Sequence, residues 1–120
     1  MKRILVVEDN DTNIYLISFI LRKNNFEVIE ARSGEEGVMR AIEEKPDLIV
    51  MDIQLPGIDG MEATKRIRES KEAGDIPIIA FTSYAMTGDR EKLLNAGCSG
   101  YIEKPINLET FITNIEKHLR

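Results

Sequence analysis

Residues 46–57 read PDLIVMDIQLPG, and this stretch indicates the fold more clearly than any other part of the chain. Four consecutive apolar residues, 48–51, lie between Pro46 and a Pro-Gly pair. A continuous apolar run of this length, bounded by turn residues, is typical of a strand buried on both faces of a parallel sheet. The acidic residue Asp52 follows the run directly. The stretch therefore predicts a central strand whose carboxyl end carries a carboxylate.

Similar short apolar runs alternate with helical periods along the whole chain. We predict strands at residues 4–7, 26–31, 48–51, 78–81 and 101–103. Helices are expected at residues 14–21, at 33–44, around 61–67, at 87–96, and after the N-cap residue Asn107. Strands that alternate with helices predict an α/β fold with a parallel sheet covered on both faces. The apolar residues predicted to face the core are Leu16, Ile17, Ile20 and Leu21 in the first helix, and Leu108, Phe111, Ile112, Ile115 and Leu119 in the last.

The distribution of charge predicts the order of the strands. The runs at 4–7, 48–51 and 78–81 are continuously apolar, whereas the second strand contains Glu27 and Glu30 and the fifth contains Glu103. Charged strands belong at the edges of a sheet. The expected fold is therefore a doubly wound, five-stranded parallel sheet of order 2-1-3-4-5, which is the flavodoxin-like (βα)5 arrangement.

Composition narrows the class of protein further. The 120 residues are the size of one domain, and no apolar run approaches the roughly 20 residues that span a bilayer. A formal charge of −5 without a basic block argues against nucleic-acid binding. One cysteine, Cys98, cannot form an internal disulfide, and one histidine, His118, excludes a multi-histidine metal site. We expect a single cytoplasmic domain over residues 1–120 that binds neither nucleic acid nor membrane.

Three carboxylates follow two neighbouring strands of the predicted sheet. Glu8 and Asp9 come directly after the first strand, and Asp52 ends the third. In such sheets ligands bind beyond the carboxyl ends of the strands where the order reverses, which here lies between strands one and three. Carboxylates that lie close together repel one another unless a cation neutralises them. Mg²⁺ is the expected cation, because it takes carboxylate, water and phosphate oxygens as ligands.

The last two strands bring complementary groups to the same edge. Thr82 follows the apolar run of the fourth strand, and Lys104 follows the fifth. A metal ion, a hydroxyl group and an ammonium group together suit a phosphoryl group, because they neutralise and bind its oxygens. Asp52 is the best candidate for a nucleophile that forms an aspartyl phosphate, while Glu8 and Asp9 are better suited to the metal.

These motifs, in this order, resemble the response-regulator receiver domains over essentially the whole chain. Each piece alone is a weak signal, and their order at the strand ends makes the match strong. Around Cys98 and residues 104–106 the chain is most similar to single-domain regulators and to the receivers of hybrid kinases, and both remain open. The matching pieces are residues 7–10 (VEDN), 51–56 (MDIQLP), 59–60 (DG), 80–83 (AFTS), 96–97 (AG) and 101–105 (YIEKP).

The resemblance implies a role for each residue of the site. Asp52 would accept a phosphoryl group from the phosphohistidine of a sensor histidine kinase or a histidine phosphotransfer protein. Asp9, Asp52 and the backbone carbonyl of Gln54 would bind Mg²⁺ directly, and Glu8 would act mainly through water. Lys104 would pair with the phosphoryl group, and the peptide bond between Lys104 and Pro105 would be cis.

The resemblance also implies how the signal reaches other proteins. Thr82 would move toward the phosphoryl group and Tyr101 would turn inward behind it, which changes the surface of the fourth helix, fifth strand and fifth helix. Gln54 and Tyr84 occupy positions that tune the dephosphorylation rate in the family. The protein would be a stand-alone receiver without an output domain, and no enzyme acting on external substrates. Its kinase, its protein target and a phosphorylation-dependent dimer are left open.

Three other functions deserve comparison. A flavin- or nucleotide-binding module would share the strand order, but neither G-x-G-x-x-G nor a P-loop motif occurs in the chain. A phosphatase of the haloacid-dehalogenase type would need an aspartate two residues after the nucleophile, where Gln54 stands. A receiver-like module could also signal by binding alone, without phosphorylation.

Two aromatic residues have no place in this scheme. Tyr15 and Phe19 lie one helical turn apart and outside the predicted core face. They are either a docking site for the phosphodonor helix or two scattered surface aromatics, and the sequence favours neither. Cys98 is predicted to fill the core, and His118 is predicted to be incidental in the last helical turn.

Overall fold

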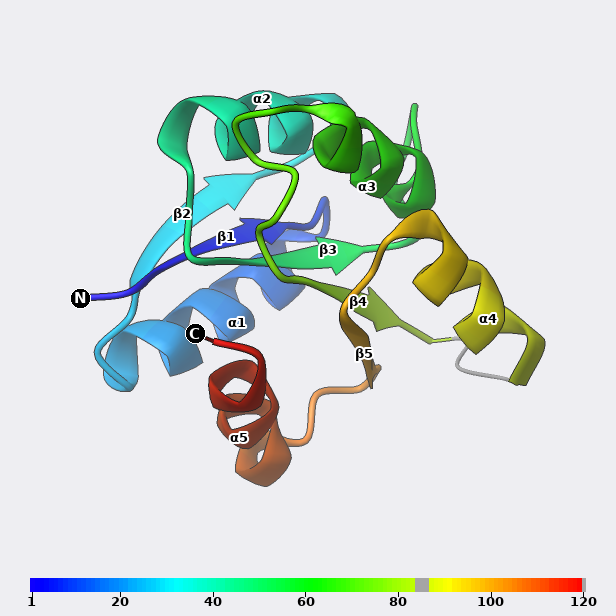
Figure 1. The fold of residues 1–120 in the computed structure, drawn as a ribbon. Coiled ribbons are helices and arrows are strands. Elements are labelled where there is room, and N and C mark those ends of the chain that lie inside the picture. Colours follow the sequence, from blue (N-terminus) through cyan, green and yellow to red (C-terminus); the bar gives the residue numbers. More distant parts are fainter. Residues whose placement is uncertain (84–86, 120) are drawn as a thin grey trace.

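The computed structural model describes residues 1–83 and 87–119, with the backbone alone at residues 87–89. Among the described residues, no helix has the length and apolar character needed to cross a membrane. The elements are, in chain order, β1 (Arg3–Val7), α1 (Asp11–Lys23), β2 (Glu27–Ala31), α2 (Gly34–Glu44), β3 (Leu48–Asp52), α3 (Gly60–Glu69), β4 (Ile78–Thr82), α4 (Thr87–Ala96), β5 (Gly100–Glu103) and α5 (Leu108–His118) (Figure 1).

The strands form one parallel sheet in the order β2-β1-β3-β4-β5, which confirms the predicted fold class and strand order. Helices cover both faces: α1 and α5 lie on one side, and α2 and α3 lie on the other (Figure 1). The reversal of strand order falls between β1 and β3, whose residues pair from Ile4 with Leu48 to Val7 with Met51. The carboxyl ends of these two strands therefore lie side by side.

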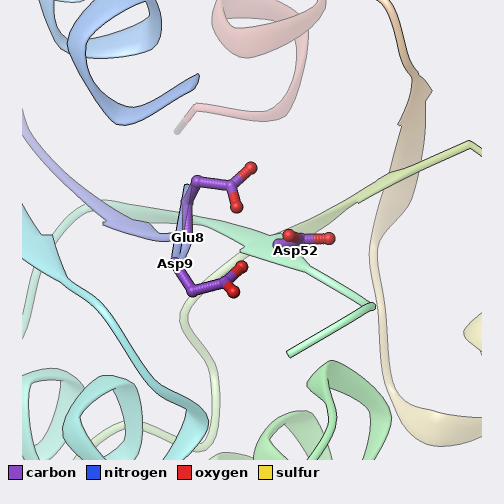
Figure 2. A group of neighbouring side chains, drawn as sticks. All are labelled: Glu8, Asp9 and Asp52. Carbon is purple, nitrogen blue, oxygen red and sulfur yellow. The ribbon is translucent and has the colours of Figure 1, made fainter. Parts of the chain in front are cut away.

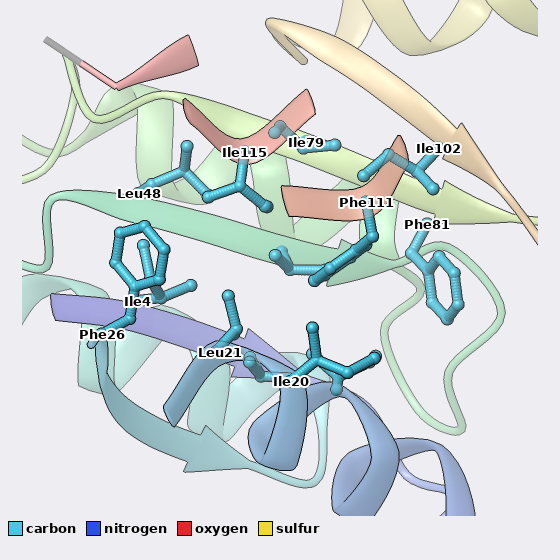
Figure 3. Packing of buried hydrophobic residues seen from close by; sticks show 13 residues of the cluster. Ile4, Ile20, Leu21, Phe26, Leu48, Ile79, Phe81, Ile102, Phe111 and Ile115 are labelled. Atoms are coloured by element: carbon cyan, nitrogen blue, oxygen red, sulfur yellow. The ribbon is translucent and has the colours of Figure 1, made fainter. Parts of the chain in front are cut away.

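Two apolar clusters, one on each face of the sheet, make up the core. Alternate residues of each strand belong to opposite clusters, so that Val6 faces α1 and α5 while Val7 faces α2 and α3. Phe111 of α5 is fully buried on the first face (Figure 3), and Ile67 of α3 is fully buried on the second. Cys98 is buried in the second cluster, as predicted. This packing holds the carboxyl ends of the strands in register.

Burial along the strands confirms the argument from charge. Every residue of β3 and β4 is buried, whereas the edge strand β2 begins with the exposed Glu27 and the edge strand β5 ends with the exposed Glu103. A strand with helices on both faces and strands on both sides has no solvent-facing position for a charged side chain. The one charged residue of β3 and β4, Asp52, stands at the very end of its strand, where Lys104 can reach it.

Two residues predicted to face the core are exposed instead. Leu16 is 37% exposed, because the buried stripe of α1 consists of Ile14, Ile17, Ser18 and Leu21 together with Ile20. Leu108 is 58% exposed, since it is the first residue of α5 and the core begins one turn later at Phe111. The predicted N-cap is confirmed: the Asn107 side chain accepts hydrogen bonds from the N–H groups of Glu109 and Thr110.

Gly60 controls how α3 approaches the carboxyl end of β3. A Cβ atom built on Gly60 would lie 2.7 Å from the Cα of Ile53 and would also overlap the backbone carbonyl oxygen of Asp52. The N–H of Gly60 donates to the carbonyl of Ile53 at 3.0 Å. The absence of a side chain at residue 60 therefore lets the helix pack against the backbone that carries Asp52.

Gly60→Ala is expected to lower the free energy of unfolding by about 1–3 kcal/mol, the usual cost of overpacking. Alanine otherwise favours a helix over glycine by up to about 1 kcal/mol, so a decrease would identify steric overlap as the larger effect. Urea denaturation measures the change. The control is Lys65→Ala, at an exposed position of the same helix, which should stay within about 0.5 kcal/mol of wild type. A more stable Gly60→Ala protein would contradict the close approach.

Candidate functional site

The predicted site residues lie at the carboxyl ends of four strands. Glu8 and Asp9 follow β1, Asp52 ends β3, Thr82 ends β4, and Lys104 follows β5. Because these strands are parallel neighbours, their carboxyl ends meet at one edge of the sheet. The structure thus brings together residues that are up to 96 positions apart in the sequence, as the strand order requires.

The three carboxylates form one compact group. One oxygen from each of Glu8, Asp9 and Asp52 lies within 4.8 Å of the others. The side chains point toward a common space beyond the ends of β1 and β3 (Figure 2). Glu8 and Asp52 are each only 1% exposed, whereas Asp9 is open to solvent. Two buried carboxylates beside an exposed one form an acidic cluster that is open to solvent at Asp9.

Lys104 supplies positive charge to this group. Its Nζ lies 3.1 Å from Oδ1 of Asp52 and 3.7 Å from Oε1 of Glu8. The same ammonium group lies 5.0 Å from the centroid of the Phe81 ring, which places an apolar wall beside it. The peptide bond between Lys104 and Pro105 is cis. The lysine is thus a partner of both buried carboxylates.

The Glu8 carboxylate is held by groups from the start of α1. Oε2 accepts a hydrogen bond from the backbone N–H of Asn10 at 3.1 Å, and Oε1 accepts one from the side-chain amide of Asn13 at 3.1 Å. Burial raises the pKa of Glu8, a hydrogen bond with Asp52 adds to the increase, and the Asn10 N–H and Lys104 oppose it. Sequence reasoning missed Asn13, although a polar residue in the first turn of a helix after an acidic strand end can reach back to that acid.

Asp52 is tied to the loop that follows it. Its Oδ1 accepts a hydrogen bond from the backbone N–H of Gln54 at 3.0 Å, in addition to the contact with Lys104. This turn places the backbone of Gln54 next to the carboxylates and leaves the Gln54 side chain exposed. Tyr84, the other predicted lifetime-tuning residue, lies outside the described residues.

Thr82 and Tyr101 occupy the side of the site toward α4. Thr82 is buried, and its carbonyl accepts a hydrogen bond from the N–H of Lys104 at 2.8 Å. Tyr101 is half-buried on β5, and the guanidinium carbon of Arg90, from α4, lies 5.0 Å from its ring centroid. Thr82 lies on β4 and Tyr101 on the neighbouring strand β5. In the register of these strands, Tyr101 pairs with Ala80 and Thr82 pairs with Glu103.

Two grooves flank the exposed side of α1. A groove of about 320 Å³ runs beside Lys104 and is lined by Asn13, Leu16, Pro105 and Ile106 among others. A groove of about 440 Å³ on the other side includes Tyr15 and Phe19, which are 72% and 53% exposed and stack with ring centroids 6.4 Å apart. The aromatic pair is therefore on the surface and outside the carboxylate site.

Neither Cys98 nor His118 belongs to the site. Burial raises the pKa of the Cys98 thiol, and its Sγ lies 3.9 Å from the hydroxyl oxygen of Thr64. The imidazole of His118 packs against Gly100, where a Cβ atom would lie 2.6 Å from Nε2, at the start of β5. These residues serve packing at positions remote from the carboxyl ends of the strands.

The donor set fits a hard divalent cation. All three carboxylates offer oxygen atoms to one place, and the repulsion among them is relieved by a positive charge. Mg²⁺ in proteins is bound by one or two carboxylates and keeps several water molecules, which an open side such as that at Asp9 allows. The side chains present therefore match the chemistry that the sequence predicted for this edge.

Comparisons with known proteins agree with this geometry. The family model described as the response regulator receiver domain matches residues 4–116. The polar-differentiation response regulator DivK of Brucella ovis is 43% identical over 118 residues, which cover 98% of this chain and 96% of that protein.

Two solved structures show the same fold over almost their whole length. The chemotaxis protein CheY4 of Vibrio cholerae has a TM-score of 0.95 and 26% identity, with 99% of each chain covered. The receiver domain of the sensor histidine kinase PA1611 of Pseudomonas aeruginosa, which has a magnesium ion coordinated in its active-site cleft, has a TM-score of 0.90 and 36% identity, with 98% of this chain and 96% of that chain covered. With the family model matching nearly all of its residues, the chain belongs to the response regulator receiver domains of two-component signalling.

Proposed function

We propose that this receiver is a switch operated by phosphorylation of Asp52. The observation that carries the proposal is the buried Asp52 carboxylate, which lies 3.1 Å from Lys104 and within one group of oxygens with Glu8 and Asp9. The phosphodonor is the phosphohistidine of a sensor histidine kinase or of a histidine phosphotransfer protein. This arrangement and the family to which the chain belongs support the proposed site residues.

Mg²⁺ is the proposed cofactor of the site. Asp9, Asp52 and the backbone carbonyl of Gln54 would hold the ion directly, and Glu8 would act mainly through water. When bound, the ion neutralises negative charge that develops on the transferred phosphoryl group. The magnesium ion in the cleft of the PA1611 receiver supports this assignment, because that domain shares the fold and 36% of the sequence.

The transfer step uses residues of this chain in defined roles. An oxygen of Asp52 attacks phosphorus as the P–N bond of the donor phosphohistidine breaks, and the donor imidazole, which carries a proton on its other ring nitrogen, leaves as a neutral ring. Lys104 moves its ammonium group from the carboxylate to the phosphoryl oxygens, and the hydroxyl of Thr82 donates a hydrogen bond to them. Asp52 returns to the free carboxylate when water hydrolyses the aspartyl phosphate. The protein thus acts on its own side chain and is not a turnover enzyme.

The output is a change in surface that a downstream protein reads. Movement of Thr82 toward the phosphoryl group leaves space that the half-buried Tyr101 can enter, and this separates its ring from Arg90. The surface formed by α4, β5 and α5 is altered as a result. We propose a cytoplasmic receiver domain over residues 1–120 whose output is a contact with a downstream protein. Gln54 and Tyr84 set the phosphate lifetime.

Intact-mass measurement after incubation with Mg²⁺ and acetyl phosphate tests the acceptor. The wild type is expected to gain one phosphoryl group, because Asp52 is buried beside Lys104 and the other carboxylates. The adduct should be absent in Asp52→Asn and in wild type treated with a chelator. An adduct on Asp52→Asn would contradict the assignment. If neither acetyl phosphate nor a phosphohistidine donor labels the wild type, the protein is a receiver-like module that signals by binding alone.

Thermal unfolding with and without Mg²⁺ tests the metal site. A ligand present at 100 times its Kd stabilises the folded state by about 2.7 kcal/mol, so Mg²⁺ should raise the Tm of the wild type. Asp9→Asn should lose this increase, while its metal-free form should be no less stable, because a like charge beside Glu8 and Asp52 has been removed.

The matched control for this charge change is Glu43→Gln, at an exposed position on α2. It should keep the full increase in Tm. An equal loss in both variants would mean that Mg²⁺ acts through general charge screening rather than at the carboxylate group.

The exposed ridge of α1, formed by Tyr15, Leu16 and Phe19, is the proposed docking site for the phosphodonor helix. The groove on one side of the ridge contains Lys104, so a helix seated against Leu16 would lie next to the acceptor site. Exposed aromatic side chains such as Tyr15 and Phe19 commonly anchor protein interfaces. The two grooves and the aromatic pair favour docking over scattered surface residues.

The double variant Tyr15→Ala with Phe19→Ala is expected to slow phosphotransfer from a protein donor about tenfold or more, because loss of an interface anchor costs about 1–2 kcal/mol. Labelling by acetyl phosphate should be unchanged, since a small donor needs no docking surface. Met39→Ala on α2, another exposed apolar side chain, is the control. Equal slowing with both donors would place the defect in the site, and unchanged transfer from the protein donor would remove the docking role.

A further inference from the structure

Two buried carboxylates at the site compete for one ammonium group. Lys104 Nζ lies 3.1 Å from Asp52 Oδ1 and 3.7 Å from Glu8 Oε1, and Glu8 and Asp52 are both 1% exposed. Coulomb attraction changes only gradually over such a small difference in distance. Distance alone therefore gives Asp52 little advantage over Glu8, and another group has to decide which carboxylate the lysine serves.

Asn13 contacts the same oxygen of Glu8 that Lys104 approaches. Its side-chain Nδ2 donates to Oε1 of Glu8 at 3.1 Å, which is the oxygen that Lys104 approaches. The other oxygen, Oε2, accepts from the N–H of Asn10. Both oxygens of Glu8 thus have a donor from the start of α1, and Glu8 depends less on Lys104. The contact of Lys104 with Asp52 is the shorter of the two.

The position of Asn13 is itself well defined. Its backbone N–H donates to the side-chain oxygen of Asn10, the N-cap of α1, at 2.9 Å. Asn13 is partly buried, and it also lines the groove that runs beside Lys104. A side chain fixed by the helix start and bonded to a buried carboxylate is placed to orient that carboxylate.

We propose that Asn13 is a positioning residue of the phosphoryl-transfer site: its amide orients Glu8 and thereby keeps Lys104 on Asp52. The inference rests on the proposed function, since it concerns the same carboxylates and the Mg²⁺ that they would hold. Without the amide, Glu8 draws Lys104 toward itself, and its carboxylate no longer points at the common space of the three acids. Binding of Mg²⁺ then weakens, although Asn13 has no contact with the ion.

The test is a double-mutant cycle between Asn13→Ala and Glu8→Ala, with the Mg²⁺ Kd as the readout. The Kd is measured from the shifts of backbone amide resonances during Mg²⁺ titration, which requires no phosphorylation. Asn13→Ala alone is expected to weaken Mg²⁺ binding about tenfold, the lower end of the effect of removing an outer partner of a metal ligand. In the Glu8→Ala background the same substitution should change the Kd less than twofold, because the carboxylate it acts through is gone.

Controls separate this role from damage to the helix. Thr12→Ala, at an exposed position in the same turn, should leave the Kd unchanged. Asn13→Leu is close to Asn13 in size but has neither charge nor amide donor, and it should weaken binding about as much as Asn13→Ala. The amide spectrum of each metal-free variant reports whether it is folded, and Asn13→Leu serves if Asn13→Ala does not fold.

The outcomes distinguish the inference from the proposed function. An unchanged Kd in Asn13→Ala and Asn13→Leu overturns the role of Asn13 and leaves the metal site intact. Equal weakening with and without Glu8 also overturns it, because Asn13 would then act by another route. Failure of the wild type to bind Mg²⁺ overturns the proposed function, and this inference with it.

Discussion

The contact of the Lys104 ammonium group with the buried carboxylates of Asp52 and Glu8 is the interaction on which the site depends. A buried carboxylate is costly without a partner charge and hydrogen bonds, and here two of them lie at adjacent strand ends. The partner comes from the far edge strand β5, across the end of β4. The order of the strands therefore matters for this contact, since an order with β5 beyond β2 would separate the lysine from Asp52.

The surrounding structure adjusts this contact rather than creating it. The start of α1 supplies donors to Glu8, the turn after β3 supplies the Gln54 N–H to Asp52, and Gly60 lets α3 pack against the backbone behind that turn. All of these groups belong to the segments that follow β1 and β3, so the segments that connect strands to helices also position the site residues. In the proposed switch, a change in charge at Asp52 would reach the surface through Thr82, Lys104 and Tyr101. Thr82 and Lys104 are joined backbone to backbone, and Tyr101 lies three residues before Lys104 on β5.

Much of the fold could be predicted from residue patterns because strands buried on both faces must be continuously apolar. Runs such as residues 48–51 carry that requirement openly, and the charges at Glu27 and Glu103 mark the edges. The predictions for Leu16 and Leu108 were wrong because a helical wheel shows which residues share a face but does not show where the sheet ends. Leu16 lies at the border of the buried stripe and Leu108 in the first turn of α5, and both are exposed. Asn13 was missed because its contact with Glu8 depends on how the first turn of α1 lies against the end of β1, which a residue pattern does not show.

Residue patterns alone were enough to predict the class of fold, the strand order and the residue types that meet at the carboxyl ends, because apolar runs and charges follow burial so closely in a parallel sheet. They also predicted that Asp52 ends a central strand while Lys104 follows an edge strand. The distances from one ammonium group to two carboxylates, and the hydrogen bond of Asn13 to Glu8, became visible only in the folded arrangement. These contacts depend on differences of less than 1 Å between groups from separate elements. Such differences are set by the packing of α1 and β5 against the sheet, and no local pattern of residues contains them.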